Sequence, residues 1–255
     1  MKCPVLMYHD VVAPGQNDAS GFPGDAAAHY KLDTDEFGRH LAALAGSGLN
    51  FCPVTASSPG GLLTFDDGGA SATGIGAALT EYRMTGHFLV TTARIGQPAF
   101  VTPRDLLTLR ASGHIVGSHS HTHPAEISRL NATALDQEWQ QSADILAQIL
   151  GEPTVVASVP GGFYSRDVAR AAAAAGIRYL FTSEPSMHTH EVDGCLVLGR
   201  YTLWRGMPPS VALSLALGTN AVRERQWLSW NLKKPLKRWA RPVYRLVRHR
   251  LLQAH

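Results

Sequence analysis

The chain has 255 residues, of which 45% are hydrophobic and 17% are charged, so it is long enough to bury one sizeable core. No stretch approaches the ~20 apolar residues of a membrane span, and the N-terminus is too polar for the apolar segment of a secretory signal. These features exclude a membrane-spanning chain. Three widely separated cysteines indicate free thiols in a reducing compartment, and we expect a cytoplasmic protein.

Strand-like and helix-like segments alternate along the chain, which predicts one α/β domain with a parallel sheet. The predicted strands lie near residues 4–8, 61–65, 86–91, 114–118, 154–158 and 178–182. The predicted helices lie near residues 34–46, 71–83, 103–112, 132–150 and 166–176.

Two adjacent carboxylates, Asp66 and Asp67, follow the apolar run 61–65 where strand becomes loop. In α/β folds, catalytic and ligand-binding residues typically lie at this edge of the sheet. The alternative is that either carboxylate only caps a turn or the helix that follows.

Three histidines, His119, His121 and His123, follow the predicted strand 114–118. A helical turn would put His119 and His123 on one face at metal-ligand spacing, whereas an extended segment would put all three on one face. A histidine-rich surface loop is the third possibility. A carboxylate with two imidazoles leaves a position open for water, as in catalytic divalent metal sites.

Together, "TFDDG" at residues 64–68 and "HSHTH" at residues 119–123 resemble the motifs of polysaccharide deacetylases of the NodB-homology type, carbohydrate esterase family 4. The resemblance implies a distorted (β/α)7-type barrel that removes N-acetyl groups from sugar polymers. It also implies that Asp66 is the general base. The expected ligands of Zn²⁺, or of a similar divalent ion such as Co²⁺, are Asp67, His119 and His123.

The third motif of that family departs from its usual form, because "SVPGG" places Ser158 where an arginine is expected. The turn is kept, and its backbone N–H groups are candidates for binding an oxyanion. Arg166 and Arg200 are the candidates to replace the missing arginine beside the base. The residues predicted to bind substrate or oxyanion are Pro160, Gly161, Gly162 and Arg200.

The family's last histidine motif is missing after the third motif, but the first strand ends in Tyr8-His9-Asp10. This start resembles that of the circularly permuted deacetylases that act on poly-N-acetylglucosamine. First and last strands of a barrel are neighbours, so His9 is the candidate general acid. The alternative is a structural core histidine, and Asp10 either caps the next loop or orients His9.

The resemblance spans residues 1–206 and implies a deacetylase domain there, followed by a basic helical extension at 207–255. From Arg223 onward there are 10 Lys or Arg and one acid, with apolar residues at near-helical spacing. Pro235 and Pro242 are expected to split this tail into shorter helices. We expect segment 223–252 to lie on an anionic membrane surface; the alternative is docking on the body or a second subunit. Nucleic acid is not an expected partner, because no binding motif is present.

The predicted activity is metal-dependent de-N-acetylation of N-acetylhexosamine residues in a bacterial exopolysaccharide or its lipid-linked precursor, at the inner membrane face. Synthesis of a capsule, biofilm or holdfast is the expected setting. The alternatives are a deacetylase of peptidoglycan or of a small amino sugar, and an inactive carbohydrate-binding scaffold.

Overall fold

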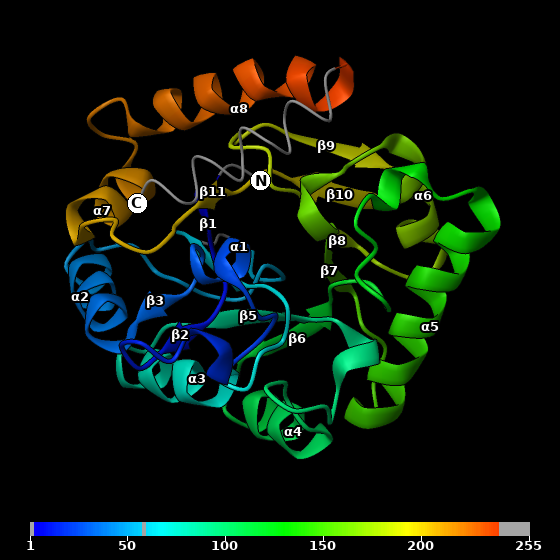
Figure 1. Cartoon of the computed structure of the whole chain (residues 1–255), viewed down its shortest axis with the longest axis horizontal. Helices are drawn as coiled ribbons and strands as arrows, with labels where there is room; N and C mark the ends of the chain where they lie inside the picture. The colour runs from blue at the N-terminus through cyan, green and yellow to red at the C-terminus, as the bar shows by residue number, and fades with distance from the viewer. Residues whose placement is uncertain (1–2, 58–59, 240–255) are drawn as a thin grey trace.

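The computed structural model describes residues 3–57 and 60–239, and it centres on a curled sheet of nine strands with helices around its outside (Figure 1). The strand order is β11-β1-β4-β5-β6-β7-β8-β10-β9. The strands are β1 (Val5–Tyr8), β4 (Leu62–Phe65), β5 (Gly86–Val90), β6 (Ile115–Ser118), β7 (Val156–Ser158), β8 (Tyr179–Phe181), β9 (Thr189–Val192), β10 (Cys195–Leu198) and β11 (Tyr201–Thr202).

The helices that cover the sheet match the five predicted ones to within a few residues, and the α/β class is confirmed. They are α2 (Thr34–Ala45), α3 (Ala72–Glu81), α4 (Pro103–Ala111), α5 (Ala132–Leu150) and α6 (Arg166–Ala174). A small second sheet pairs β2 (Val11–Val12) with β3 (Leu32–Asp33), and the short helix α1 (Asp25–Ala28) lies between these two strands in the chain.

Within the main sheet, every neighbouring pair is parallel except β9 with β10. The carboxyl ends of eight strands therefore meet at one edge. β1 lies between β4 and β11, so the strand that precedes His9 is directly beside the strand that precedes Asp66.

A break between β10 and β11 was not predicted. β10 pairs with β8, whereas β11, which follows after two intervening residues, pairs with β1. Gly199 lies at the break, where a Cβ atom would be 2.4 Å from the carbonyl oxygens of both Glu184 and Ser186. Only glycine fits this close approach, and the next residue, Arg200, enters the interior of the fold with no exposed surface.

The C-terminal part begins with α7 (Pro209–Leu217), which packs on α2 and β1 and buries Ala212, Leu215 and Ala216. α8 (Val222–Trp239) follows and runs past β9, β10 and β11 (Figure 1). The expectation that Pro235 ends a helix is wrong, because α8 continues through it. A proline removes one backbone hydrogen bond, which a helix can accommodate by bending. Pro242 and the rest of the predicted tail after residue 239 lie outside the described residues.

Acid will destabilise the fold through His87 in β5. Its Nδ1 donates to the Leu63 carbonyl at 2.8 Å and its Nε2 accepts from the Val54 N–H at 2.9 Å, so the buried ring is neutral. Burial lowers the pKa of His87 from 6.5 to about 4. Between these values the unfolded chain takes up a proton that the folded chain does not. The free energy of unfolding therefore decreases as the pH is lowered from 6.5 to 4, by up to roughly 3 kcal/mol.

Urea unfolding at pH 7 and at pH 4.5 measures this loss. The variant His87→Leu is less stable at both pH values, because the Val54 N–H loses its partner, but its stability should change less between them. An equal pH difference in the two proteins would contradict the assignment to His87.

Candidate active site

The two carboxylates separate at the end of β4. The Asp66 N–H still bonds the Tyr8 carbonyl, as in the sheet, whereas Asp67 has a left-handed φ of 78°. This turn sends the two side chains in different directions. The positive φ at Asp67 is therefore the cause of the separation.

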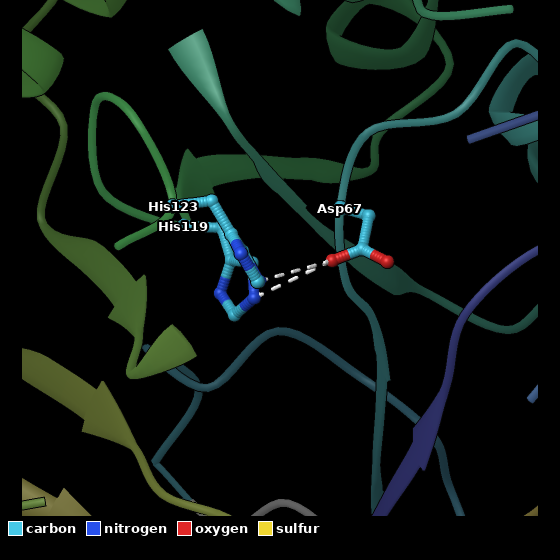
Figure 2. A group of neighbouring side chains, drawn as sticks. All are labelled: Asp67, His119 and His123. Atoms are coloured by element: carbon cyan, nitrogen blue, oxygen red, sulfur yellow. Dashed lines mark ion pairs between the residues drawn. The ribbon is translucent and has the colours of Figure 1, made fainter. Parts of the chain in front are cut away.

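Asp67 faces His119 and His123, as Figure 2 shows. One Asp67 oxygen lies 3.5 Å from His119 Nε2 and 3.7 Å from His123 Nε2. The three ligand atoms all lie within 4.8 Å of one another, and no other such group of three occurs in the described chain. Two imidazoles and a carboxylate that converge in this way fit a divalent ion such as Zn²⁺.

The histidines do not converge through a helical turn or an extended strand, so both predicted geometries are wrong. Segment 119–126 is irregular, with left-handed φ values of 63° at Ser120 and 59° at His123. His121 points away and bonds the Thr92 hydroxyl at 2.9 Å.

Glu138 on α5 holds this loop, and no motif in the sequence predicted this role. One carboxylate oxygen accepts the N–H groups of His121 and Thr122 at 3.0 and 2.9 Å, and the other accepts the Thr122 hydroxyl at 2.5 Å. A buried carboxylate that satisfies these donors fixes the loop that carries both candidate histidine ligands.

Asp66 is buried and forms a two-pronged ion pair with Arg200, with both N–O distances at 2.7 Å. Arg200 also donates to the Thr182 carbonyl and the Thr64 hydroxyl, which fixes the guanidinium. Arg166, the other predicted candidate, is exposed at the start of α6. The structure therefore brings Arg200 to the base, from a part of the chain far from the third motif.

The protonation states of the site follow from burial and charge. Burial raises the pKa of Asp66, but the Arg200 charge outweighs this effect, so the pKa lies well below its usual range. Burial raises the pKa of Asp67 to about 7, the nearby His9 opposes this, and the Asp66 charge adds to it. Burial lowers the pKa of His119 to about 3. Asp66 is thus ionised and His119 neutral at pH 7, as a base and a metal ligand require.

His9 lies at the same edge, with its ring 4.9 Å from that of Tyr30, and its Nδ1 has no hydrogen-bond partner in the described chain. Asp10 does not orient it. Asp10 instead accepts hydrogen bonds from the hydroxyls of Ser20 and Ser71 at 2.5 and 2.8 Å, so it caps the following loops.

The predicted oxyanion turn forms a single 3₁₀ turn, Pro160–Gly162, at the carboxyl end of β7. Both glycines have left-handed φ values, and a Cβ atom on Gly162 would lie 2.9 Å from Trp230 and 3.1 Å from Ser183. Trp230 belongs to α8, so the C-terminal helix packs against this turn. The sequence did not predict that contact.

At the carboxyl edge of the curled sheet, an ionised carboxylate lies beside three residues that could hold a metal ion. This arrangement suits metal-assisted hydrolysis. Residues 55–180 match the sequence model of the family "Polysaccharide deacetylase". Over just under half of its length, the chain is therefore similar to the polysaccharide deacetylases, a family of hydrolases.

Individual proteins are similar to this chain over more of its length. YxkH of Bacillus subtilis, itself named only provisionally as a polysaccharide deacetylase, is 24% identical over 82% of this chain and 74% of its own. The deacetylase PplD of Streptococcus pyogenes, solved in complex with acetate, shares the fold with a TM-score of 0.71 and 20% identity, over 85% of this chain and 98% of its own. IcaB of Ammonifex degensii gives a TM-score of 0.66 and 19% identity, over 84% and 97%.

Proposed function

We propose that this protein removes acetyl groups from N-acetylhexosamine residues of a bacterial exopolysaccharide or its lipid-linked precursor, in a reaction that depends on a divalent metal. The observation that carries the proposal is the Asp67, His119 and His123 cluster beside the ionised, arginine-paired Asp66. The names of YxkH, provisionally a polysaccharide deacetylase, and of PplD, a deacetylase solved with acetate, support this class of reaction.

The donor set fits Zn²⁺ or Co²⁺, because it combines two imidazole nitrogens with one carboxylate and leaves a position open. When bound, such an ion would polarise the amide carbonyl and make the attacking water more acidic.

The chain's own residues supply the proton transfers. Asp66 takes a proton from the attacking water, and Arg200 holds its carboxylate in one orientation. The backbone N–H groups of Gly161 and Gly162 lie in the turn proposed to stabilise the oxyanion. His9 gives a proton to the departing amine as the C–N bond breaks, which leaves acetate and a free amino sugar.

We also propose that the curled sheet is a distorted (β/α)7 barrel of the circularly permuted kind. β10 and β11 together would form its seventh strand, since they pair with β8 and β1 respectively. The position of β1 beside β4 supports the permutation, because it puts His9 next to Asp66 although the two lie far apart in the sequence.

Acetate release from N-acetylglucosamine oligomers, peptidoglycan and free N-acetylglucosamine tests this function against its alternatives. The largest kcat/KM is expected with the oligomers. Preference for peptidoglycan or the monomer would select one of the alternative substrates. Binding of oligomers without acetate release would indicate an inactive scaffold.

We propose that α8 and the basic residues after it bind an anionic membrane surface. Arg223 and Gln226 hold the start of α8 on the body through bonds to the backbone of Leu215 and Thr202. Three apolar side chains on α8 project outward, with exposed fractions of 47%, 53% and 73% for Trp227, Leu228 and Leu232. Apolar side chains among cations suit an anionic lipid surface. In the described chain, no helix is long and apolar enough to cross a bilayer.

The three cysteines Cys3, Cys52 and Cys195 are free, which supports a reducing compartment. We therefore propose that the membrane surface is the cytoplasmic one.

Exchange of Trp227, Leu228 and Leu232 for serine should weaken binding to phosphatidylglycerol vesicles by about tenfold or more, because their apolar area would no longer enter the lipid. Co-sedimentation with vesicles measures the effect. Leu107→Ser is the control, because Leu107 is exposed to the same fraction as Trp227 but lies on α4. Equal weakening by the control would contradict the proposal, as would a dimer in solution that only the triple variant abolishes.

A further inference from the structure

Ser158 lies between the metal cluster and the base. It is fully buried at the end of β7, and its hydroxyl oxygen is 2.5 Å from His119 Nδ1 and 3.1 Å from an Asp66 carboxylate oxygen. The other nitrogen of the same imidazole, His119 Nε2, faces Asp67. Ser158 is therefore the one side chain that bonds both a candidate metal ligand and the candidate base within the described chain.

Donor and acceptor counting fixes the direction of these hydrogen bonds. Asp66 accepts a hydrogen bond from Arg200 at each carboxylate oxygen, and a carboxylate paired in this way can only accept, so the single Ser158 hydroxyl hydrogen is donated to it. Toward His119 the same oxygen can then only accept. His119 Nδ1 also lies 3.2 Å from the Ser158 carbonyl oxygen, which is another acceptor. Both contacts require the hydrogen on Nδ1, which leaves the Nε2 lone pair free toward Asp67 and His123.

We propose that Ser158 is a positioning residue that selects the Nδ1–H tautomer of His119 for metal binding and ties this ligand to Asp66. The inference rests on the proposed function for the identity of the base and of the metal ligands. Hydrogen bonds to the second nitrogen of a ligating histidine typically change metal affinity by about 10- to 100-fold.

The serine does what an arginine at this position cannot do. A guanidinium has donors only, so it could bond Asp66 but could not accept the His119 Nδ1–H. In this chain the two tasks are divided: Arg200 neutralises the Asp66 charge, and Ser158 joins the base to the ligand.

Zinc affinity of the metal-free protein tests the proposal without substrate. Competition with a chelating dye should show about 10- to 100-fold weaker zinc binding in Ser158→Ala. Ser158→Thr keeps the hydroxyl and should bind zinc nearly as tightly as the wild type. The visible absorption of the Co²⁺ form should shift in the alanine variant only. Ser214→Ala is the matched control, because Ser214 is also buried and hydrogen-bonded but lies on α7.

Unchanged zinc affinity and an unchanged Co²⁺ spectrum in Ser158→Ala would overturn the proposal. Should the alanine variant not fold, ¹⁵N NMR of the metal-free wild type reads the His119 tautomer directly, and a hydrogen on Nε2 would equally overturn it. Because neither measurement needs turnover, failure of the deacetylase assignment and failure of this inference are distinguishable.

Discussion

Replacement of Asp66 by asparagine will lower the rate of acetate release by about 10²- to 10⁴-fold while zinc stays bound. The amide has the same shape as the carboxylate and still accepts a hydrogen bond from Arg200, but it cannot take a proton from water. The candidate zinc ligands Asp67, His119 and His123 are unchanged. Steady-state acetate release and metal content of the purified variant measure the two effects.

His119→Ala is the contrasting variant, since it removes a candidate ligand and should lose both zinc and activity. Full activity in either variant would contradict the roles assigned here. Loss of zinc from Asp66→Asn would place Asp66 among the ligands instead of beside them.

Arg200→Ala should destabilise the fold by about 3–5 kcal/mol, because it leaves the Asp66 charge buried without its partner. The same change removes the charge that lowers the pKa of Asp66. That pKa should therefore rise, and the acid limb of the pH–rate profile should move to higher pH. Urea unfolding and a pH profile of kcat/KM measure these effects.

The double variant Asp66→Asn, Arg200→Met separates charge from packing. Since it buries no unpaired charge, it should be more stable than Arg200→Ala. Equal losses of stability in both proteins would show that the cost comes from lost packing of the arginine side chain rather than from the unpaired carboxylate.

Local patterns predicted much of this fold. Apolar runs ending in polar residues located β1, β4, β5, β6, β7 and β8, and periodic apolar residues located α2 to α6. The same patterns could not reveal β10 and β11, because this strand is interrupted at Gly199 and Arg200 by a close approach of distant backbone. α8 was predicted to break at Pro235, but tertiary context overrode that local preference.

The site was predictable only where its residues are neighbours in the sequence. Motif spacing identified Asp66, Asp67, His119 and His123, which the structure brings together. Left-handed backbone at Asp67, Ser120 and His123 orients these side chains. None of these three positions is a glycine, so the sequence does not indicate the turns. Glu138 also went unnoticed, because a glutamate in an amphipathic helix ordinarily faces solvent.

The pairing of Arg200 with Asp66 could be offered only as one of two candidates. A contact between residues separated by 134 positions depends on which strands become neighbours, not on local pattern. From the sequence, Ser158 is only the residue that stands where the family motif has an arginine. Its hydrogen bonds to His119 and Asp66 depend on the three-dimensional fold.

The most direct test is acetate and free-amine release from N-acetylglucosamine oligomers by protein that is first stripped of metal and then given one equivalent of zinc, beside zinc-loaded Asp66→Asn. The account predicts equal amounts of acetate and amine from the zinc-loaded wild type, and almost none from the stripped protein or the variant. Release that does not depend on metal, or that persists in the variant, would contradict it.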